Sequence, residues 1–251
     1  FGNSGTNGGA FYYGVHEDCT AGANTAANGG GSYYGTSIHC RFIGNTASSY
    51  GGGTYYGAAT NCVMTLNVAT NYGGGAAYGT LVNCQLDGNS AKYGGGAAYP
   101  TALRNCTIVG NCADNGPAYW SASSTSGTIR WANYRMQSGG ADLYDNNAVD
   151  PMLIKDENGI YRLSEHSPCI DAGLADATSL GPTDLLGEVR LQGDAVDLGA
   201  VEGGVEGRYV GVLNDGYGTA FGGYVTGEDG SVTLRAEELD GAHNFLGFYV
   251  G

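Results

Sequence analysis

The feature that most constrains this chain is a regular sequence repeat that fills positions 1–112. A cysteine recurs at successive spacings of 21, 22, 22 and 22, and tyrosine, asparagine and glycine keep the same period. The columns are Cys19, Cys40, Cys62, Cys84 and Cys106; Tyr13, Tyr34, Tyr56, Tyr78 and Tyr99; Asn3, Asn24, Asn45, Asn67, Asn89 and Asn111; and glycines at 8–9, 29–31, 51–53, 73–75 and 94–96. Four residue types in one register predict a solenoid of stacked repeats.

The residues of the repeat indicate strands rather than helices. Glycine triplets beside aromatic and β-branched residues are poor helix formers, and the leucine positions of leucine-rich repeats are absent. Around the cysteine, apolar and polar residues alternate, as in Ile38–Phe42, with the period of a half-buried strand. We predict an all-β fold, a right-handed parallel β-helix with one repeat per coil. One strand passes through the cysteine and a second through the tyrosine, with corners at asparagine and glycine.

Each column then has a structural role. We expect the asparagines to turn the chain and to form a hydrogen-bonded amide ladder, and the glycines to permit tight corners. The cysteines favour a ladder of buried thiols over a zinc site, because no Cys-x-x-Cys pair or Cys/His cluster is present. Cys112 and Cys169 lie outside the ladder, and a disulfide between them is left open.

The tyrosines admit two interpretations. They fill the coil interior, or they form an outward aromatic platform for sugar rings. The neighbouring column is Tyr12, Tyr33, Tyr55, Ala77 and Ala98, so strand alternation places one tyrosine column outward in the first three coils. Structural packing is favoured for the tyrosines in general, and Tyr12, Tyr33 and Tyr55 are the candidate binding surface.

The acidic charge lies outside the repeat and divides the chain. The net charge is −14, yet residues 1–112 hold three acidic and three basic side chains. We predict β-helix coils over 1–135, an irregular capping region over 136–206 and a small antiparallel β module over 207–251. The acidity counts against nucleic acid as a partner, and the absence of a run of about 18 apolar residues excludes a membrane-spanning helix in this piece.

The first residues fall inside a coil. Gly2-Asn3-Ser4 aligns with Gly44-Asn45-Thr46, and the chain shows neither an initiating Met nor a signal-peptide pattern. We therefore expect a piece of a longer protein, with upstream coils or an end-to-end stacking partner next to residue 1.

The repeat resembles a bacterial family. The Gly-Gly-x-x-Tyr segments, with Phe42–Asn45, Leu86–Asn89 and Ile108–Asn111, are similar to the repeats of chlamydial polymorphic outer-membrane proteins and related surface β-helices. Residues 150–203 resemble the choice-of-anchor Q region that ends many secreted bacterial β-helix proteins, through Asp150–Leu153, Ser167–Gly173 and Val196–Glu202. Together the two resemblances imply a bacterial protein that is secreted or at the cell surface, and they imply no reaction.

The same acidic region holds a cluster of charged residues with two interpretations. Asp171, Asp184, Asp197 and Glu202 could bind calcium, since this cation prefers several carboxylate and carbonyl oxygens. Alternatively they form a buried network with Arg190 that fixes the terminal turns and covers the open end of the helix. The sequence favours the network.

Two classes of function remain. The first is a non-catalytic surface protein, an adhesin, stalk or scaffold that binds a glycan or a host or cell-surface ligand. The alternative is a polysaccharide lyase or glycoside hydrolase of the pectin-lyase-like type, which needs paired carboxylates or a base beside calcium. The sequence identifies no catalytic residue and no cofactor apart from the calcium considered above, because the four histidines are scattered and no nucleophile–base pair is visible. We therefore favour the non-catalytic class.

Overall fold

The computed structural model describes residues 1–100, 102–120, 128–134, 152–172, 182–190 and 195–203, together with the short stretches 208–209, 221–224, 235–239 and 245–250. No helix occurs among these residues, so no described helix could cross a membrane. The predicted boundaries at 135–136 and 206–207 lie outside the described residues.

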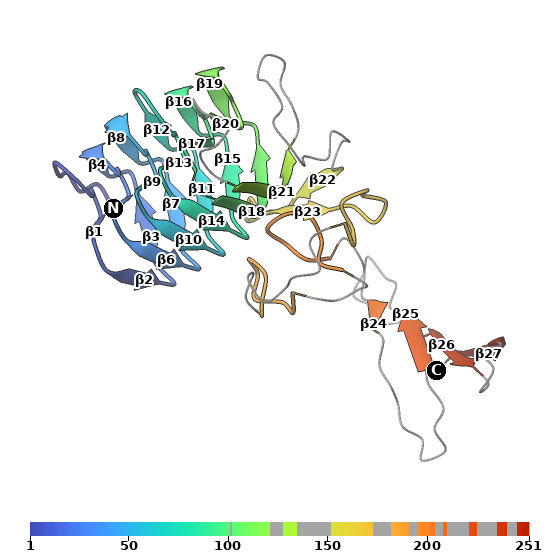
Figure 1. The fold of residues 1–251 in the computed structure, drawn as a ribbon. Helices are drawn as coiled ribbons and strands as arrows, with labels where there is room; N and C mark the ends of the chain where they lie inside the picture. The colour runs from blue at the N-terminus through green and yellow to red at the C-terminus, as the bar shows by residue number, and fades with distance from the viewer. Residues whose placement is uncertain are drawn as a thin grey trace.

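Residues 1–120, which we term the shaft, form a parallel β-solenoid of about five turns, as predicted (Figure 1). The first sheet consists of β1 (Phe11–Tyr12), β5 (Ser32–Tyr33), β9 (Thr54–Tyr55), β13 (Ala76–Ala77), β17 (Ala97–Ala98) and β20 (Tyr119–Trp120). The third sheet consists of β4 (Thr25–Asn28), β8 (Thr46–Tyr50), β12 (Val68–Ala69), β16 (Ser90–Tyr93) and β19 (Cys112–Asn115). Every one of these pairings is parallel and joins equivalent positions of successive repeats.

The second sheet has ten strands because one long strand joins two stacks. One stack is β2 (Val15–Glu17), β6 (Thr36–Ile38), β10 (Ala58–Thr60) and β14 (Thr80–Val82). The other is β3 (Thr20–Gly22), β7 (Arg41–Ile43), β11 (Val63–Thr65) and β15 (Gln85–Asp87). β18 (Ala102–Val109) pairs with β14 at its start and with β15 at its end, and β21 (Thr128–Tyr134) pairs with β18.

Each regular coil turns at four corners, and a residue with left-handed backbone marks each corner. The first corner uses Tyr13, Tyr34, Tyr56, Tyr78 and Tyr99, with φ from 47° to 57°. The second uses Asp18, His39, Asn61, Asn83 and Asn105, and the third uses Ala23, Gly44, Leu66, Gly88 and Gly110. The fourth uses the first glycine of each run, and at Gly51 an added Cβ would lie 2.1 Å from the Thr54 carbonyl oxygen. There only glycine fits.

These corners correct two expectations. In the first four coils the strand predicted through the cysteine is broken, because the left-handed residue of the second corner directly precedes the cysteine, whereas in the fifth coil β18 runs through Cys106. The asparagine column does not itself turn the chain, since the residue before each asparagine does so. Apolar–polar alternation also describes a chain that bends sharply at a polar residue, so the pattern alone could not locate the corner.

The amide ladder is confirmed and lies fully buried. The Nδ2 of Asn24 donates to Asn45 Oδ1 at 2.8 Å, and Asn45 donates to Asn67 in the same way at 3.0 Å. Asn67 and Asn89 continue the ladder to Asn111. Each Oδ1 also accepts the backbone N–H of the preceding rung. Both halves of each amide are therefore satisfied within the core.

The rest of the interior is mainly apolar, with Ser32, Ser37 and Thr54 as buried hydroxyl residues. Phe42, Met64, Leu86 and Ile108 stack in successive coils and are buried. The cysteines from Cys40 to Cys106 are buried free thiols that donate to nearby backbone carbonyls, as Cys84 does to Val82 O at 3.2 Å. Burial raises the pKa of Cys84 well above its ordinary value. The buried thiol ladder is thus confirmed from Cys40 onward.

Residues 152–172, 182–190 and 195–203, which we term the lateral segment, pack against the side of the shaft. The hairpin of β22 (Leu153–Lys155) and β23 (Tyr161–Leu163) meets the outward side of the second sheet, where Gln85 Nε2 donates to Gly159 O at 2.8 Å. Further along, the backbone N–H of Ala200 donates to Thr107 Oγ1 at 3.2 Å. The described contacts therefore run along the side of several successive coils. The predicted cover over the open end of the helix stays a prediction.

Apolar contacts and charge pairs complete this interface. Val63 clusters with Ile160 and Val201, and Val82 with Val196. Lys155 pairs with Asp87. Because these shaft side chains alternate with inward ones, the second sheet is covered on both faces at Val63, Val82 and Asp87, whereas the outward residues of β2, such as Val15, are exposed.

The remaining described strands form a separate antiparallel sheet. They are β24 (Arg208–Tyr209), β25 (Phe221–Tyr224), β26 (Arg235–Leu239) and β27 (Phe245–Val250). The antiparallel pairing agrees with the alternating sequence of this region.

Candidate functional site

The candidate binding residues Tyr12, Tyr33 and Tyr55 lie on the outer side of the first sheet. Their rings stack in register, with centroids 5.3 Å apart for Tyr12 and Tyr33 and 5.4 Å apart for Tyr33 and Tyr55. Tyr12 is 60% exposed. The sequence required one outward tyrosine column in the first three coils and left open which column it is; the structure places this one on the outside.

The adjacent column from Tyr13 to Tyr99 also lies outside, which strand alternation did not predict. The reason is the left-handed backbone of this corner, which rotates the side chain out of the strand pattern. Its rings stack from coil to coil at centroid distances of 4.7–5.4 Å. Planes in this column are inclined by 53–87° to those of the first column, so the two columns form a herringbone.

A third column was missed. Tyr50, Tyr72 and Tyr93 stack at 5.3 and 5.0 Å, and Trp120 contacts both Tyr72 and Tyr93. Their spacing matches the repeat and was visible in the sequence, but each lies just before a glycine run and belongs to the third sheet or its end.

The third column extends the surface where the first column ends. In the fourth and fifth coils, Ala77 and Ala98 take the place of tyrosine in the first column. There the ring of Tyr72 contacts Tyr99 of the column that runs from Tyr13 to Tyr99, with centroids 5.6 Å apart. We term the whole surface the aromatic face. It comprises Tyr12, Tyr13, Tyr33, Tyr34, Tyr50, Tyr55, Tyr56, Tyr72, Tyr78, Tyr93, Tyr99 and Trp120.

The aromatic face is nearly uncharged. The segments 8–14, 29–36, 50–58, 72–80 and 93–101 contain no Asp, Glu, Lys or Arg, and the cation at its edge is Lys92, 5.5 Å from the ring centroid of Tyr93. Burial among neighbouring rings raises the pKa of Tyr55 and of Tyr78 to about 12. The phenols therefore stay protonated and can donate hydrogen bonds at neutral pH.

The backbone of this corner is costly for tyrosine. A left-handed residue with a Cβ costs about 1–2 kcal/mol, and the column holds five of them. Each stacked aromatic pair returns about 0.5–1.5 kcal/mol. The column makes four coil-to-coil stacks and further ring contacts with the neighbouring columns, so the ring contacts together at least match the backbone cost.

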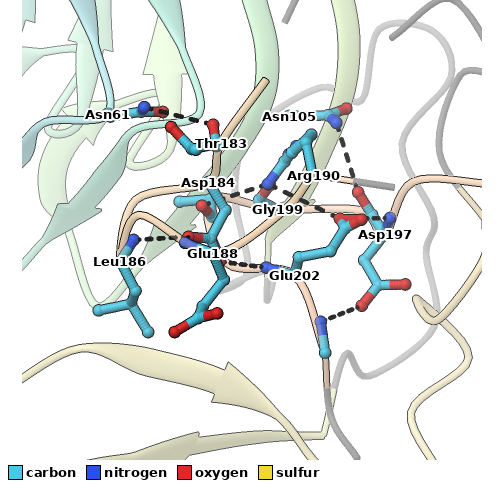
Figure 2. A network of polar contacts seen from close by, with 12 residues as sticks. Asn61, Asn105, Thr183, Asp184, Leu186, Glu188, Arg190, Asp197, Gly199 and Glu202 are labelled. Carbon is cyan, nitrogen blue, oxygen red and sulfur yellow. Dashed lines mark hydrogen bonds and ion pairs between the residues drawn. The ribbon is translucent and has the colours of Figure 1, made fainter. Parts of the chain in front are cut away.

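The charged residues predicted in the acidic region come together in the lateral segment (Figure 2). Arg190 is 1% exposed, and its Nη1 lies 3.7 Å from Glu202 Oε1, while its Nη2 donates to Gly199 O at 2.7 Å. Asp184 accepts the backbone N–H groups of Leu186 and Glu202, both within 2.8 Å. These contacts describe a structural network around one buried arginine.

The other two predicted carboxylates take part through backbone groups. Asp197 accepts the N–H groups of Asp171 and Gly203, both at 2.8 Å, and Asp171 accepts that of Ala195 at 3.3 Å. Carboxylates that face N–H donors are poorly placed for a cation, and no group of three or more His, Cys, Asp or Glu side chains within the described residues could hold a metal ion. Calcium binding stays an untested prediction.

The remaining sequence-based candidates are separated. Cys112 is exposed on β19 and Cys169 is buried beside Leu198, and both are free thiols, so the bridge left open is not formed. His16 stacks on Phe11, His39 lies at the second corner and His166 is exposed beside Glu165, while His243 lies outside the described residues.

Comparisons with protein-family models, curated proteins and solved structures found no match to this chain. The resemblances to chlamydial polymorphic outer-membrane proteins and to the choice-of-anchor Q region therefore stay predictions.

Proposed function

We propose that this chain is a non-catalytic binding scaffold, secreted or at a bacterial cell surface, that binds an extended glycan through the aromatic face. The observation that carries the proposal is the uninterrupted array of eleven tyrosines and Trp120 along the shaft. Exposed aromatic patches of this extent mark interaction surfaces, and tyrosine combines an apolar ring with a hydroxyl at low entropic cost.

The chemistry of the face favours a neutral polymer. Ring edges can contact the C–H groups of pyranose rings, and the protonated phenols can hydrogen-bond sugar hydroxyls. The lack of cations in these segments gives an acidic glycan no ionic partner there. Because the rungs repeat at ring-centroid distances of 5.4 and 4.9 Å along the shaft, we expect a chain that lies along the shaft and gains contacts with length.

The backbone supports a role beyond folding. Asparagine adopts the left-handed backbone at a lower cost than tyrosine does, so the presence of tyrosine at this outward corner in five coils supports use of the side chain at the surface.

The test is affinity electrophoresis in native gels that contain a neutral β-glucan or polygalacturonate. We expect retardation in the neutral gel, lost in the double variant Tyr34→Asn/Tyr56→Asn and kept in the control Tyr161→Asn, which changes a tyrosine of the lateral segment. Equal migration in all gels would contradict the proposal. Shortening of either polymer in the presence of calcium would favour the lyase or hydrolase alternative.

A further inference from the structure

The aromatic face runs along the shaft as two adjoining columns of rings. In the first three coils, the column that begins at Tyr12 lies beside the column that begins at Tyr13, and ring centroids within each coil are 4.7–4.9 Å apart. Beyond the third coil, the third column takes the place of the first through Tyr72 and Tyr93. Trp120 ends the array with its centroid 4.8 Å from that of Tyr99. Two rows of rings therefore adjoin over the length of the shaft.

The columns are straight and held in place. Planes of stacked rings in successive coils are inclined by only 4–28° within all three columns. Because a twisted sheet would rotate each ring further than the one before it, these small angles indicate rows that follow the shaft. Each ring is fixed between its neighbours, so little freedom remains to be lost when a ligand binds.

The face lies open on the outer side of the first sheet. Tyr13, Tyr34 and Tyr56 are 51%, 39% and 42% exposed. Sites for single small ligands are concave and enclose most of the ligand surface, which an outer face of this kind does not do. A flexible single chain bound here would keep one side in water and would still lose its conformational freedom.

A polysaccharide whose chains are already packed side by side avoids this loss. Its chains are ordered before binding, so few torsions become fixed on contact. Two adjoining rows of rings offer contact lines to such a surface, and the contacts along each line act together. The ring-bearing segments 8–14, 29–36, 50–58, 72–80 and 93–101 hold no Asp, Glu, Lys or Arg, which suits a neutral polymer.

We propose that the aromatic face binds the surface of an insoluble neutral polysaccharide whose parallel chains are packed together, in preference to an isolated chain of the same sugar. This preference rests on the proposed glycan binding and narrows its ligand to the packed form. The third column carries the preference, because it continues the contact past the point where Ala77 and Ala98 end the first column. A short dissolved chain can make its contacts on the first three coils alone.

The experiment measures depletion of the intact chain from solution by crystalline cellulose and by amorphous cellulose regenerated from it, with crystalline and amorphous chitin as a second pair. In at least one pair we expect the dissociation constant to be at least about tenfold lower for the crystalline form. Equal or tighter binding to the amorphous forms would overturn the preference and leave the proposed glycan binding intact. Binding to none of the four would also overturn it, and retardation in the neutral β-glucan gel then decides the proposed function separately.

Asparagine is the matched substitution for the third column. Asn28 and Asn115 occupy the equivalent position in other coils, where they pair with Tyr50 and Tyr93 respectively. An asparagine at this position is therefore compatible with the shaft.

The double variant Tyr72→Asn/Tyr93→Asn should weaken binding to the crystalline polymer about tenfold and change binding of dissolved cellohexaose or chitohexaose, followed by amide chemical shifts in NMR, less than about twofold. Tyr50→Asn is a milder second test in the same direction. Tyr161→Asn in the lateral segment is the control and should change neither. Unchanged binding to the crystalline polymer, or an equal loss for the crystalline polymer and the dissolved chain, in a double variant that keeps its fold by circular dichroism would contradict the proposal.

Discussion

The first and second corners of the shaft have the same left-handed backbone and opposite surroundings. At the second corner, Asn61, Asn83 and Asn105 are buried, and Asn61 and Asn105 contact the lateral segment. At the first corner, tyrosine stands in every regular coil and faces outward. Asparagine is suited to this backbone and tyrosine is not. The comparison teaches that one kind of backbone corner carries asparagine where the lateral segment covers it and tyrosine where it faces outward, a difference that the proposed role of the aromatic face would explain.

Both corners depend on a common interior, and breaking it should give the largest effect. Asn67→Ala leaves the backbone N–H of Asn45 and the carbonyl of Phe42 without these partners, and removes one of the two acceptors of Asn45 Nδ2, which keeps Ala21 O. At about 1–3 kcal/mol for each buried unsatisfied group, we expect the free energy of unfolding to fall by about 4 kcal/mol. Urea denaturation measures it. Asn71→Ala, at a half-buried position of the same coil, is the control and should cost less than about 1 kcal/mol.

The covered face should fail alone when its buried charge pair is broken. Arg190→Ala leaves Glu202 buried without its cation, and the expected loss is about 3 kcal/mol. Limited proteolysis should then cut the lateral segment while the shaft stays protected. Simultaneous loss of shaft protection would show that the two faces are not separable.

A further effect on the same network is expected from pH. Burial raises the pKa of Glu202 to about 8 from an ordinary 4.5, with Asp197 and Asp184 also raising it and Arg190 lowering it. Burial raises the pKa of Asp197 as well. Because the folded chain holds the proton of Glu202 more tightly than the unfolded chain does, protonated Glu202 contributes to stability. This contribution is complete below pH 4.5 and is lost as the pH rises toward 8.

Denaturation curves measured between these pH values should therefore show falling stability of the lateral segment. Glu202→Gln should flatten this dependence. Stability that rises with pH between 4.5 and 8 would contradict the raised pKa of the buried Glu202.

The smallest changes in stability are expected when the residue of one corner is placed at the other. The two substitutions should differ clearly in their effect on the free energy of unfolding. Asn83→Tyr forces a ring into a fully buried corner and should cost about 1–3 kcal/mol. Tyr56→Asn relieves the backbone while losing the stacks with Tyr34 and Tyr78, so the free energy of unfolding should stay within about 1 kcal/mol. Equal losses in both variants would remove the distinction between the corners.

The sequence predicts well the interior that all coils share, and it predicts poorly how the corners differ from one another. The spacing of Asn24 to Asn111 leads directly to the buried ladder, because a constant period and a self-pairing amide leave one arrangement. The break before Cys40 was missed because His39 is not a residue type that signals a left-handed corner as glycine does. For the same reason Tyr34 was not expected outside together with Tyr33.

The location of the lateral segment could not be predicted because its contacts are long-range. Gln85 meets residues 74 and 76 positions away, and Thr107 meets one 93 positions away. Val63 and Val82 are apolar residues at outward positions, as is typical of a sheet that is buried on both faces. Two such residues are too few to stand out from the repeat in the sequence.

The most direct test of the account is the affinity of the intact chain for a neutral, unbranched β-glucan, measured by isothermal titration calorimetry. We predict binding that strengthens with chain length and weakens at least about tenfold in Tyr34→Asn/Tyr56→Asn, while Arg162→Gln binds as the unaltered chain does. Unchanged affinity in the tyrosine double variant, with its fold intact by circular dichroism, would contradict the claim that the aromatic face is the binding surface.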